Sequence, residues 1–164
     1  MSTHLTHLDE KGRAVMVDIS AKTQTHRVAI AGGWISMNDE TFSEIVSGDN
    51  RKGDVLGTAR VAGIMAAKRC AELIPLCHPI STESIIIEFE MIPESCTIKA
   101  RCTVSCIGKT GVEMEALCGV NLALLTIYDM CKALDQGMTI QGVRLLRKNG
   151  GKSGDYRRSD DPDA

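Results

Sequence analysis

A long helix with apolar residues on both of its sides constrains this chain more than any other feature of its sequence. The pattern predicts a helix from Gly111 to Leu134, started by the capping-box spacing of Thr110 and Glu113 and closed by Gly137. One side carries a continuous apolar stripe, formed by Leu117, Val120, Leu124, Ile127 and Cys131. Because the opposite side is also apolar, the helix must be buried on both sides.

That second apolar side contains a carboxylate, Asp129, which projects among Cys118, Leu122 and Leu125. In a two-layer domain a partner chain has to cover this side, so we expect a homo-oligomer with Asp129 and Lys132 near its interface. An aspartate among buried leucines has a raised pKa unless it is paired, which suits a general acid, and Lys132 is close enough to pair with it. A structural ion pair is the alternative interpretation.

A second carboxylate on this helix, Glu115, lies 14 residues before Asp129. On a straight helix the two are about 21 Å apart, so one small substrate cannot easily touch both in a single chain. If two copies of the helix pack antiparallel across a two-fold axis, Glu115 of one copy approaches Asp129 of the other. The sequence therefore suggests a site shared between two chains.

Alternating apolar residues predict the strands. The segments 84–92 and 96–107 alternate on either side of the turn Pro93-Glu94-Ser95 and therefore form a hairpin, with Ile98, Ala100, Cys102, Val104 and Cys106 inward on the second strand. The other predicted elements are a strand over 27–35, a helix over 36–47 capped by Ser36 and ended by Gly48, a helix over 54–73 whose small apolar stripe reaches Leu73, and a strand over 138–148 with a bulge at Gly142.

Without the short first helix, the order of elements is βαββαβ. This order predicts a ferredoxin-like α+β fold, with an antiparallel sheet and helices packed on one face. We expect a single domain over residues 15–148. The polar segment 1–14 and the glycine-rich, charged tail 149–164 are predicted to be flexible, because they bury too little to offset their ordering entropy.

Composition disfavours several classes of function. A net charge of −2 and an aromatic content of 3% argue against binding of nucleic acid. No apolar run approaches the ~20 residues that cross a bilayer, so no membrane association is expected. Seven cysteines without a secretory signal indicate reduced thiols in the cytoplasm.

His78 lies in a predicted loop between Pro75 and Pro79, which stiffen the backbone and fix the position of the ring. Such a histidine suits an acid, a base or a phosphate donor, and a packing histidine is the alternative. Zinc bound through the adjacent Cys77 and His78 is a weak interpretation, because no CxxC or HxxxH partner exists, and no metal site is expected.

Lys52 precedes a helix N-terminus, where free amides and the helix dipole favour phosphate, although a solvated charge in a turn is the alternative. The segments Gly108-Lys109-Thr110 and Gly151-Lys152-Ser153 both lack the upstream glycine of a P-loop, so ATPase chemistry is not indicated. Both can still contribute lysines to an anion site.

Three short motifs, LCHP at 76–79, GVEMEAL at 111–117 and IYDMCKA at 127–133, carry a resemblance to a known family. Together with KGDVLGTARVAGIMAAKR at 52–69 and VRLLRKNGGKSG at 143–154, they resemble the cyclic pyranopterin monophosphate synthases from Leu5 to about Arg158. The resemblance implies a cytoplasmic lyase of the phosphorus–oxygen type in molybdenum cofactor biosynthesis. Its substrate would be (8S)-3′,8-cyclo-7,8-dihydroguanosine 5′-triphosphate, and its products would be cyclic pyranopterin monophosphate and pyrophosphate.

The same resemblance implies a ferredoxin-like hexamer, built as a trimer of dimers with sites at the dimer interfaces. Asp129 matches the family's catalytic aspartate, with Lys132 beside it as a second catalytic residue. The substrate-binding positions would be Lys52, Leu76, Cys77, His78, Glu113, Met114, Glu115 and Lys148. No cofactor is required, although Mg²⁺ can accompany the triphosphate. A nucleotide-binding regulatory module and a structural subunit remain the rival interpretations, because a fold alone does not fix a function.

Overall fold

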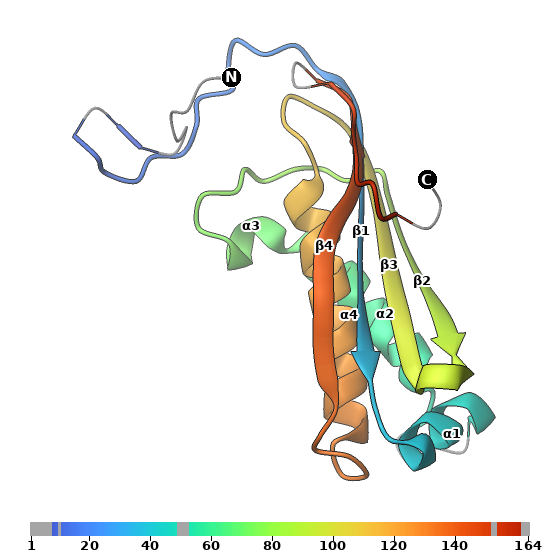
Figure 1. The fold of residues 1–164 in the computed structure, drawn as a ribbon. Coiled ribbons are helices and arrows are strands. Elements are labelled where there is room, and N and C mark those ends of the chain that lie inside the picture. The colour runs from blue at the N-terminus through green and yellow to red at the C-terminus, as the bar shows by residue number, and fades with distance from the viewer. Residues whose placement is uncertain (1–7, 10, 49–52, 152–153, 162–164) are drawn as a thin grey trace.

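The computed structural model describes residues 8–9, 11–48, 53–151 and 154–161. The elements follow in the order β1 (Thr25–Ser36), α1 (Asp39–Ser47), α2 (Val55–Lys68), α3 (Cys70–Leu73), β2 (Ser84–Ile92), a 3-10 turn (Pro93–Ser95), β3 (Thr97–Gly108), α4 (Glu113–Cys131), β4 (Thr139–Asn149) and β5 (Tyr156–Arg157). The strands form one antiparallel sheet in the order β2-β3-β1-β4-β5, and α2 and α4 cover one face of it (Figure 1). The predicted ferredoxin-like α+β fold is therefore confirmed, with β5 added at an edge.

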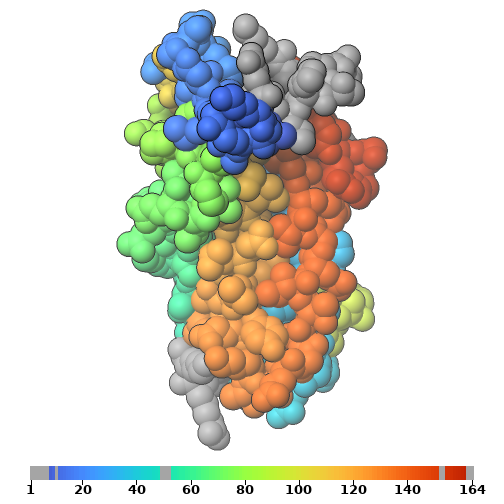
Figure 2. All heavy atoms as spheres, turned by 90° about the vertical axis from the view of Figure 1, so that its left-hand side faces the viewer, coloured from blue at the N-terminus to red at the C-terminus, as the bar shows by residue number. Residues whose placement is uncertain are grey.

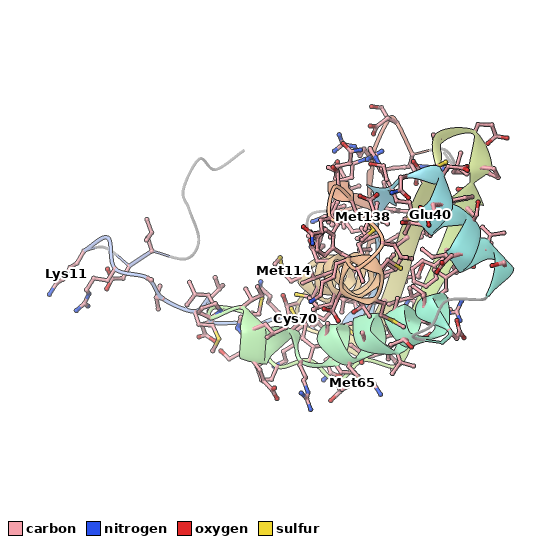
Figure 3. The ribbon with its side chains drawn as sticks, turned by 90° about the horizontal axis from the view of Figure 1, so that it is seen from below. Lys11, Glu40, Met65, Cys70, Met114 and Met138 are labelled. Atoms are coloured by element: carbon pink, nitrogen blue, oxygen red, sulfur yellow. The ribbon has the colours of Figure 1, made fainter. Side chains whose placement is uncertain are left out.

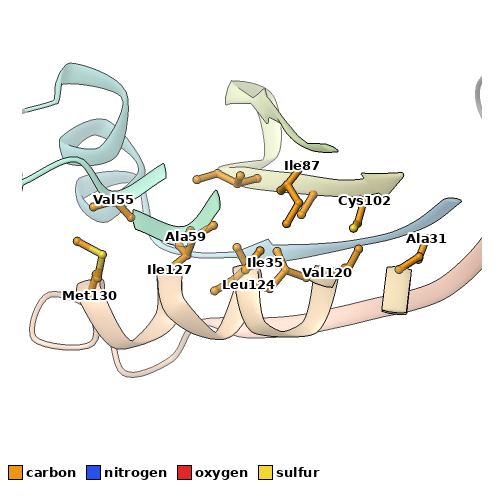
Figure 4. Close-up of a cluster of buried hydrophobic side chains, with 14 of the residues drawn as sticks. Ala31, Ile35, Val55, Ala59, Ile87, Cys102, Val120, Leu124, Ile127 and Met130 are labelled. Carbon is orange, nitrogen blue, oxygen red and sulfur yellow. The ribbon is translucent and has the colours of Figure 1, made fainter. Parts of the chain in front are cut away.

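The core fills the space between the sheet and the two long helices. The central strands β1 and β3 pair without interruption, from Thr25 opposite Gly108 to Ser36 opposite Thr97. Every inward position predicted on the second hairpin strand is at most 2% exposed. The close-up in Figure 4 shows how these strands meet the helices through Ala31, Ile35, Val55, Ala59, Ile87, Cys102, Val120, Leu124, Ile127 and Met130.

Two glycines set the distance between α2, α4 and the sheet. A Cβ atom added at Gly63 on α2 would lie 2.7 Å from the carbonyl oxygen of Gly119, and one added at Gly119 on α4 would lie 2.6 Å from Cys102 Sγ. Real Cβ atoms essentially never approach other atoms so closely. The helices can therefore pack this tightly only because both positions lack a side chain.

Several predicted helix boundaries are wrong. Ser36 ends β1, and the N-cap of α1 is Asn38, whose side-chain oxygen accepts the backbone N–H of Thr41 at 2.8 Å. The short side chain of Asn38 can reach that amide, whereas Ser36 is still paired in the sheet. Gly48 ends α1 with φ of 76°, as predicted.

The helix predicted over 54–73 is divided at Arg69 into α2 and α3. Leu73, placed on its apolar stripe, is 54% exposed, because α3 begins a new direction. On α4 the N-cap is Val112, without a side-chain hydrogen bond, so the predicted capping box is absent. The bulge predicted at Gly142 is present: φ is 65° there, and the pairing of β4 with β1 shifts register between Gly32 and Trp34.

The two ends of the chain differ in how they join the domain. The N-terminal arm, where Leu8 and Ala14 form an isolated bridge, extends away from the layered part together with Lys11 (Figures 1 and 3). At the other end, Tyr156 and Arg157 form β5 within the segment predicted to be a flexible tail. This part of the tail therefore belongs to the sheet, because its backbone finds hydrogen-bond partners at the edge of β4.

Among the described residues, α4 is long and apolar enough by length and composition alone to cross a membrane, a test that the core helix of a soluble protein also passes. Half of its apolar window is buried inside the domain. Burial against the sheet and α2 is what a core helix of a soluble protein requires. All seven cysteines lie in the described part of the chain, and none forms a disulfide.

Replacing Gly63 by Ala should destabilise the protein by about 1–3 kcal/mol, because the added methyl group has to push α2 away from α4. Urea unfolding at one fixed protein concentration measures this change. Lys68→Ala, at the exposed last turn of α2, is the control and should change stability by less than about 0.5 kcal/mol. Equal stability of Gly63→Ala and the parent chain would contradict the packing described above.

Candidate functional site

Two adjoining cavities lie at the N-terminal end of α4. The basic cavity, of about 670 Å³, is lined by strand ends, by the segment 21–25 and by four cations, Lys22, Arg27, Lys109 and Lys148. The carboxyl cavity, of about 270 Å³, is lined by the loop after α3 and the first turn of α4, including Leu76, Cys77, His78, Met114 and Glu115. They share Lys22, Thr110, Gly111 and Glu113, and so form one continuous depression.

The basic cavity suits an anion, because among the described residues four cations and a single carboxylate line it. The Lys109 Nζ donates to the carbonyl of Ser20 at 2.8 Å, which ties the β3–α4 loop to the N-terminal segment. The guanidinium of Arg27 lies against the backbone of Gly151, where a Cβ atom would overlap it. Glycine at 151 therefore lets the end of β4 approach this cation.

One ion pair joins the end of β4 to the start of α4. Lys148 Nζ lies 3.3 Å from Glu113 Oε1, and their side chains are 26% and 29% exposed. Both residues line the basic cavity. An anion that enters can therefore bind Lys148 while Glu113 keeps the lysine oriented.

The carboxyl cavity contains a buried acid. Glu115 is 3% exposed, and burial raises the pKa of its carboxyl above the usual range, with a further rise from the nearby Glu113 carboxylate. Burial and the Glu115 charge also raise the pKa of the Cys70 thiol. The Cys70 sulfur accepts a hydrogen bond from the Cys118 thiol at 3.6 Å. The raised pKa favours the protonated form of Glu115, which is the direction that a general acid requires.

His78 connects the N-terminal segment to this cavity. Its Nε2 lies 2.7 Å from the carbonyl oxygen of Val17. Because a carbonyl only accepts, Nε2 must carry a proton and donate it. The segment that contains Val17 therefore fixes the ring at the wall of the cavity that Glu115 also lines.

Asp129 and Lys132 lie at the opposite end of α4. Lys132 Nζ donates to Asp129 Oδ1 at 2.7 Å, and this carboxylate raises the pKa of Lys132. Their side chains are 64% and 55% exposed, and Leu125 beside them is 50% exposed. Burial of Asp129 therefore requires another chain. Within one chain α4 is continuous, which keeps Asp129 about 21 Å from Glu115.

The structure brings most of the predicted binding residues together and leaves the predicted catalytic pair apart from them. The two cavities contain Leu76, Cys77, His78, Glu113, Met114, Glu115 and Lys148. Lys52 lies outside the described residues. Lys22 and Arg27 were not among the predicted site residues, and the pairing of β1 with β3 and β4 places Arg27 beside the cavity.

Fold and site together define a ferredoxin-like domain that can hold a nucleotide-sized anion beside a buried acid and a fixed histidine. The MoaC family model matches residues 16–151, and the chain belongs to this family. It is 55% identical over 152 residues to the cyclic pyranopterin monophosphate synthase of Roseiflexus sp., covering 93% of this chain and 96% of the relative. It is 53% identical over 156 residues to that of Clostridium botulinum, covering 95% and 98%.

Glu115→Gln should stabilise the protein, and the gain should grow with pH. The pKa of Glu115 is higher in the folded than in the unfolded chain, so the folded state binds more protons and its stability falls as pH rises above the unfolded value. The amide carries no charge to bury. Urea unfolding of both proteins at pH 5 and pH 8 measures the difference, and a gain that shrinks toward pH 8 would contradict the assignment.

Proposed function

We propose that this chain is a cyclic pyranopterin monophosphate synthase of molybdenum cofactor biosynthesis. It would convert (8S)-3′,8-cyclo-7,8-dihydroguanosine 5′-triphosphate into cyclic pyranopterin monophosphate, as a lyase that releases pyrophosphate. The observation that carries this proposal is identity of more than half the residues to synthases over nearly the whole chain. The cation-lined cavity supports it, because the reaction needs a site for a triphosphate.

The basic cavity is the proposed site of the phosphates. Pyrophosphate leaves as an anion, so charge develops on its oxygens in the transition state. Lys22, Arg27, Lys109 and Lys148 place fixed positive charge around that position. The base and sugar would then lie in the carboxyl cavity, where Glu115 and His78 orient them or exchange protons with them.

The predicted catalytic pair would come from a second copy. In Figure 2 α4 reaches the surface along one face, between α2–α3 and β4. Large apolar side chains are exposed on the two helices, among them Val61 at 57%, Met65 at 48% and Leu125 at 50%. Such a surface favours association, and antiparallel packing of α4 on α4 would carry Asp129 and Lys132 to the neighbour's Glu115.

In this arrangement Asp129 loses its contact with water and keeps Lys132 as its partner. A carboxylate–ammonium pair of this kind can take a proton at one step and return it at another, as opening and closing of rings requires. We propose a cytoplasmic hexamer, a trimer of such dimers. The reaction calls for no resident cofactor, and Mg²⁺ can accompany the triphosphate, a requirement that turnover in the presence of EDTA measures.

Asp129→Asn and Lys132→Ala should each lower turnover by at least about 100-fold, because removal of a positioned proton-transfer group costs 10²–10⁴-fold. Release of pyrophosphate and formation of the pterin from the cyclised triphosphate measure this loss, and light scattering checks the assembly. Lys99→Ala, which removes an exposed ion pair with Glu90 on the other sheet face, is the control. Wild-type rates in both site variants would refute the assignment and favour a structural ion pair.

Mixing two inactive variants tests whether the site is shared. In a heterodimer of Asp129→Asn with Glu115→Gln, one of the two shared sites keeps both native carboxylates, and the other loses both. Random mixing should then restore about a quarter of the wild-type rate. The measurement is pyrophosphate release after co-expression. Each variant mixed with itself is the control, and no recovery in verified heterodimers would place Glu115 and Asp129 in separate sites.

A further inference from the structure

The C-terminal segment carries a buried carboxylate that the proposed reaction does not use. Asp161 is 5% exposed although it lies close to the chain end, and its Oδ1 lies 3.3 Å from Arg101 Nη1. Removing a carboxylate from water is costly, so it persists only where a cation and hydrogen bonds compensate. The pair therefore fixes the end of the segment to β3 on the face of the sheet that the helices leave open.

Residues 155–161, here called the strap, are attached to the sheet at several points. Asn149 Nδ2 donates to Asp155 Oδ1 at 2.7 Å, and Tyr156 and Arg157 pair with β4. The backbone N–H of Arg158 then donates to the carbonyl of Leu146 at 2.8 Å. From β4 the strap crosses the outer face over β1, because Arg101 belongs to β3 and the sheet order is β3-β1-β4.

The strap adjoins the part of β4 that forms one wall of the basic cavity. Lys148, which lines that cavity and pairs with Glu113, is opposite Tyr156 in the β4–β5 ladder and opposite Ala29 of β1. The cavity continues along Asn149, which holds Asp155 of the strap. The end of β4 is thus held between β1 and the strap, so its position depends on both neighbours.

We propose that Asp161 is a positioning residue for substrate binding: its pair with Arg101 anchors the strap, and the strap holds Lys148 and the Gly150–Gly151 backbone where they contact the phosphates. This inference rests on the proposed function. Asp161 touches no part of the basic cavity, so it acts only through β4. Loss of the anchor lowers the fraction of molecules whose cavity wall is formed. The apparent dissociation constant for the substrate rises in inverse proportion to that fraction.

Asp161→Asn tests this role through three readouts. The KM for the cyclised triphosphate should rise about tenfold with kcat within about twofold, because a formed wall binds substrate and transition state alike. Inorganic pyrophosphate should bind about tenfold more weakly by calorimetry. Backbone amides of residues 147–151 should exchange hydrogen faster. Glu90→Gln, which breaks the Lys99–Glu90 pair at 3.2 Å on the same face and leaves the Arg101–Asp161 pair intact, should change none of these.

Arg101→Met should reproduce the Asp161→Asn effects, and the double variant should not exceed either single one. Exchange of the two charges in Arg101→Asp/Asp161→Arg should restore at least part of the affinity. If Asp161→Asn does not fold, Arg101→Lys provides the same readouts. Unchanged pyrophosphate affinity and amide exchange, or a fall in kcat at constant KM, would overturn the proposal. A parent chain that binds pyrophosphate but leaves the cyclised triphosphate intact would refute the proposed function alone.

Discussion

Close packing of α4 between the sheet and α2 is the constraint on which the rest of the molecule depends. Gly63 and Gly119 allow the two helix backbones to approach each other, and Gly119 also leaves room for the thiol of Cys102 on β3. Apolar side chains of α4, such as Leu124 and Ile127, then lose all contact with water. Because this contact fixes the axis of α4 against β1 and β3, it fixes both ends of the helix in space.

Both groups of site residues depend on that axis. At the first turn of α4, Glu113 and Glu115 meet the ends of β1 and β4 and the loop that carries His78, so cations and a buried acid surround one depression. At the last turn, Asp129 and Lys132 stay exposed on the helix surface. A rigid helix of this length cannot bring its two ends together, and this is the physical reason for proposing a site completed by a second chain.

Burial has opposite consequences for the carboxylates of this domain. Glu115 lies in the wall of the carboxyl cavity, and burial raises its pKa, which destabilises the charged form relative to the protonated one. Asp161 is also buried but is paired with Arg101, which suits an anchor that must stay in place. The same side-chain chemistry thus suits the proton transfer proposed for Glu115 and the attachment of the strap proposed for Asp161, according to the surroundings of each carboxyl.

Local patterns in the sequence determined the strands, the long helix and the motif residues, because alternation and helical periodicity depend on neighbours within a few positions. They predicted the inward side chains of β3 and the Gly142 bulge, whereas the grouping of His78 with Glu115 was implied by the family resemblance. The predicted N-terminal caps of α1 and α4 were wrong, since several polar side chains near a helix start can compete for the same free amides. Only the tertiary structure decided that Lys22 and Arg27 join the basic cavity and that the supposed tail returns to Arg101, because these contacts connect residues far apart in the chain and follow from strand pairing.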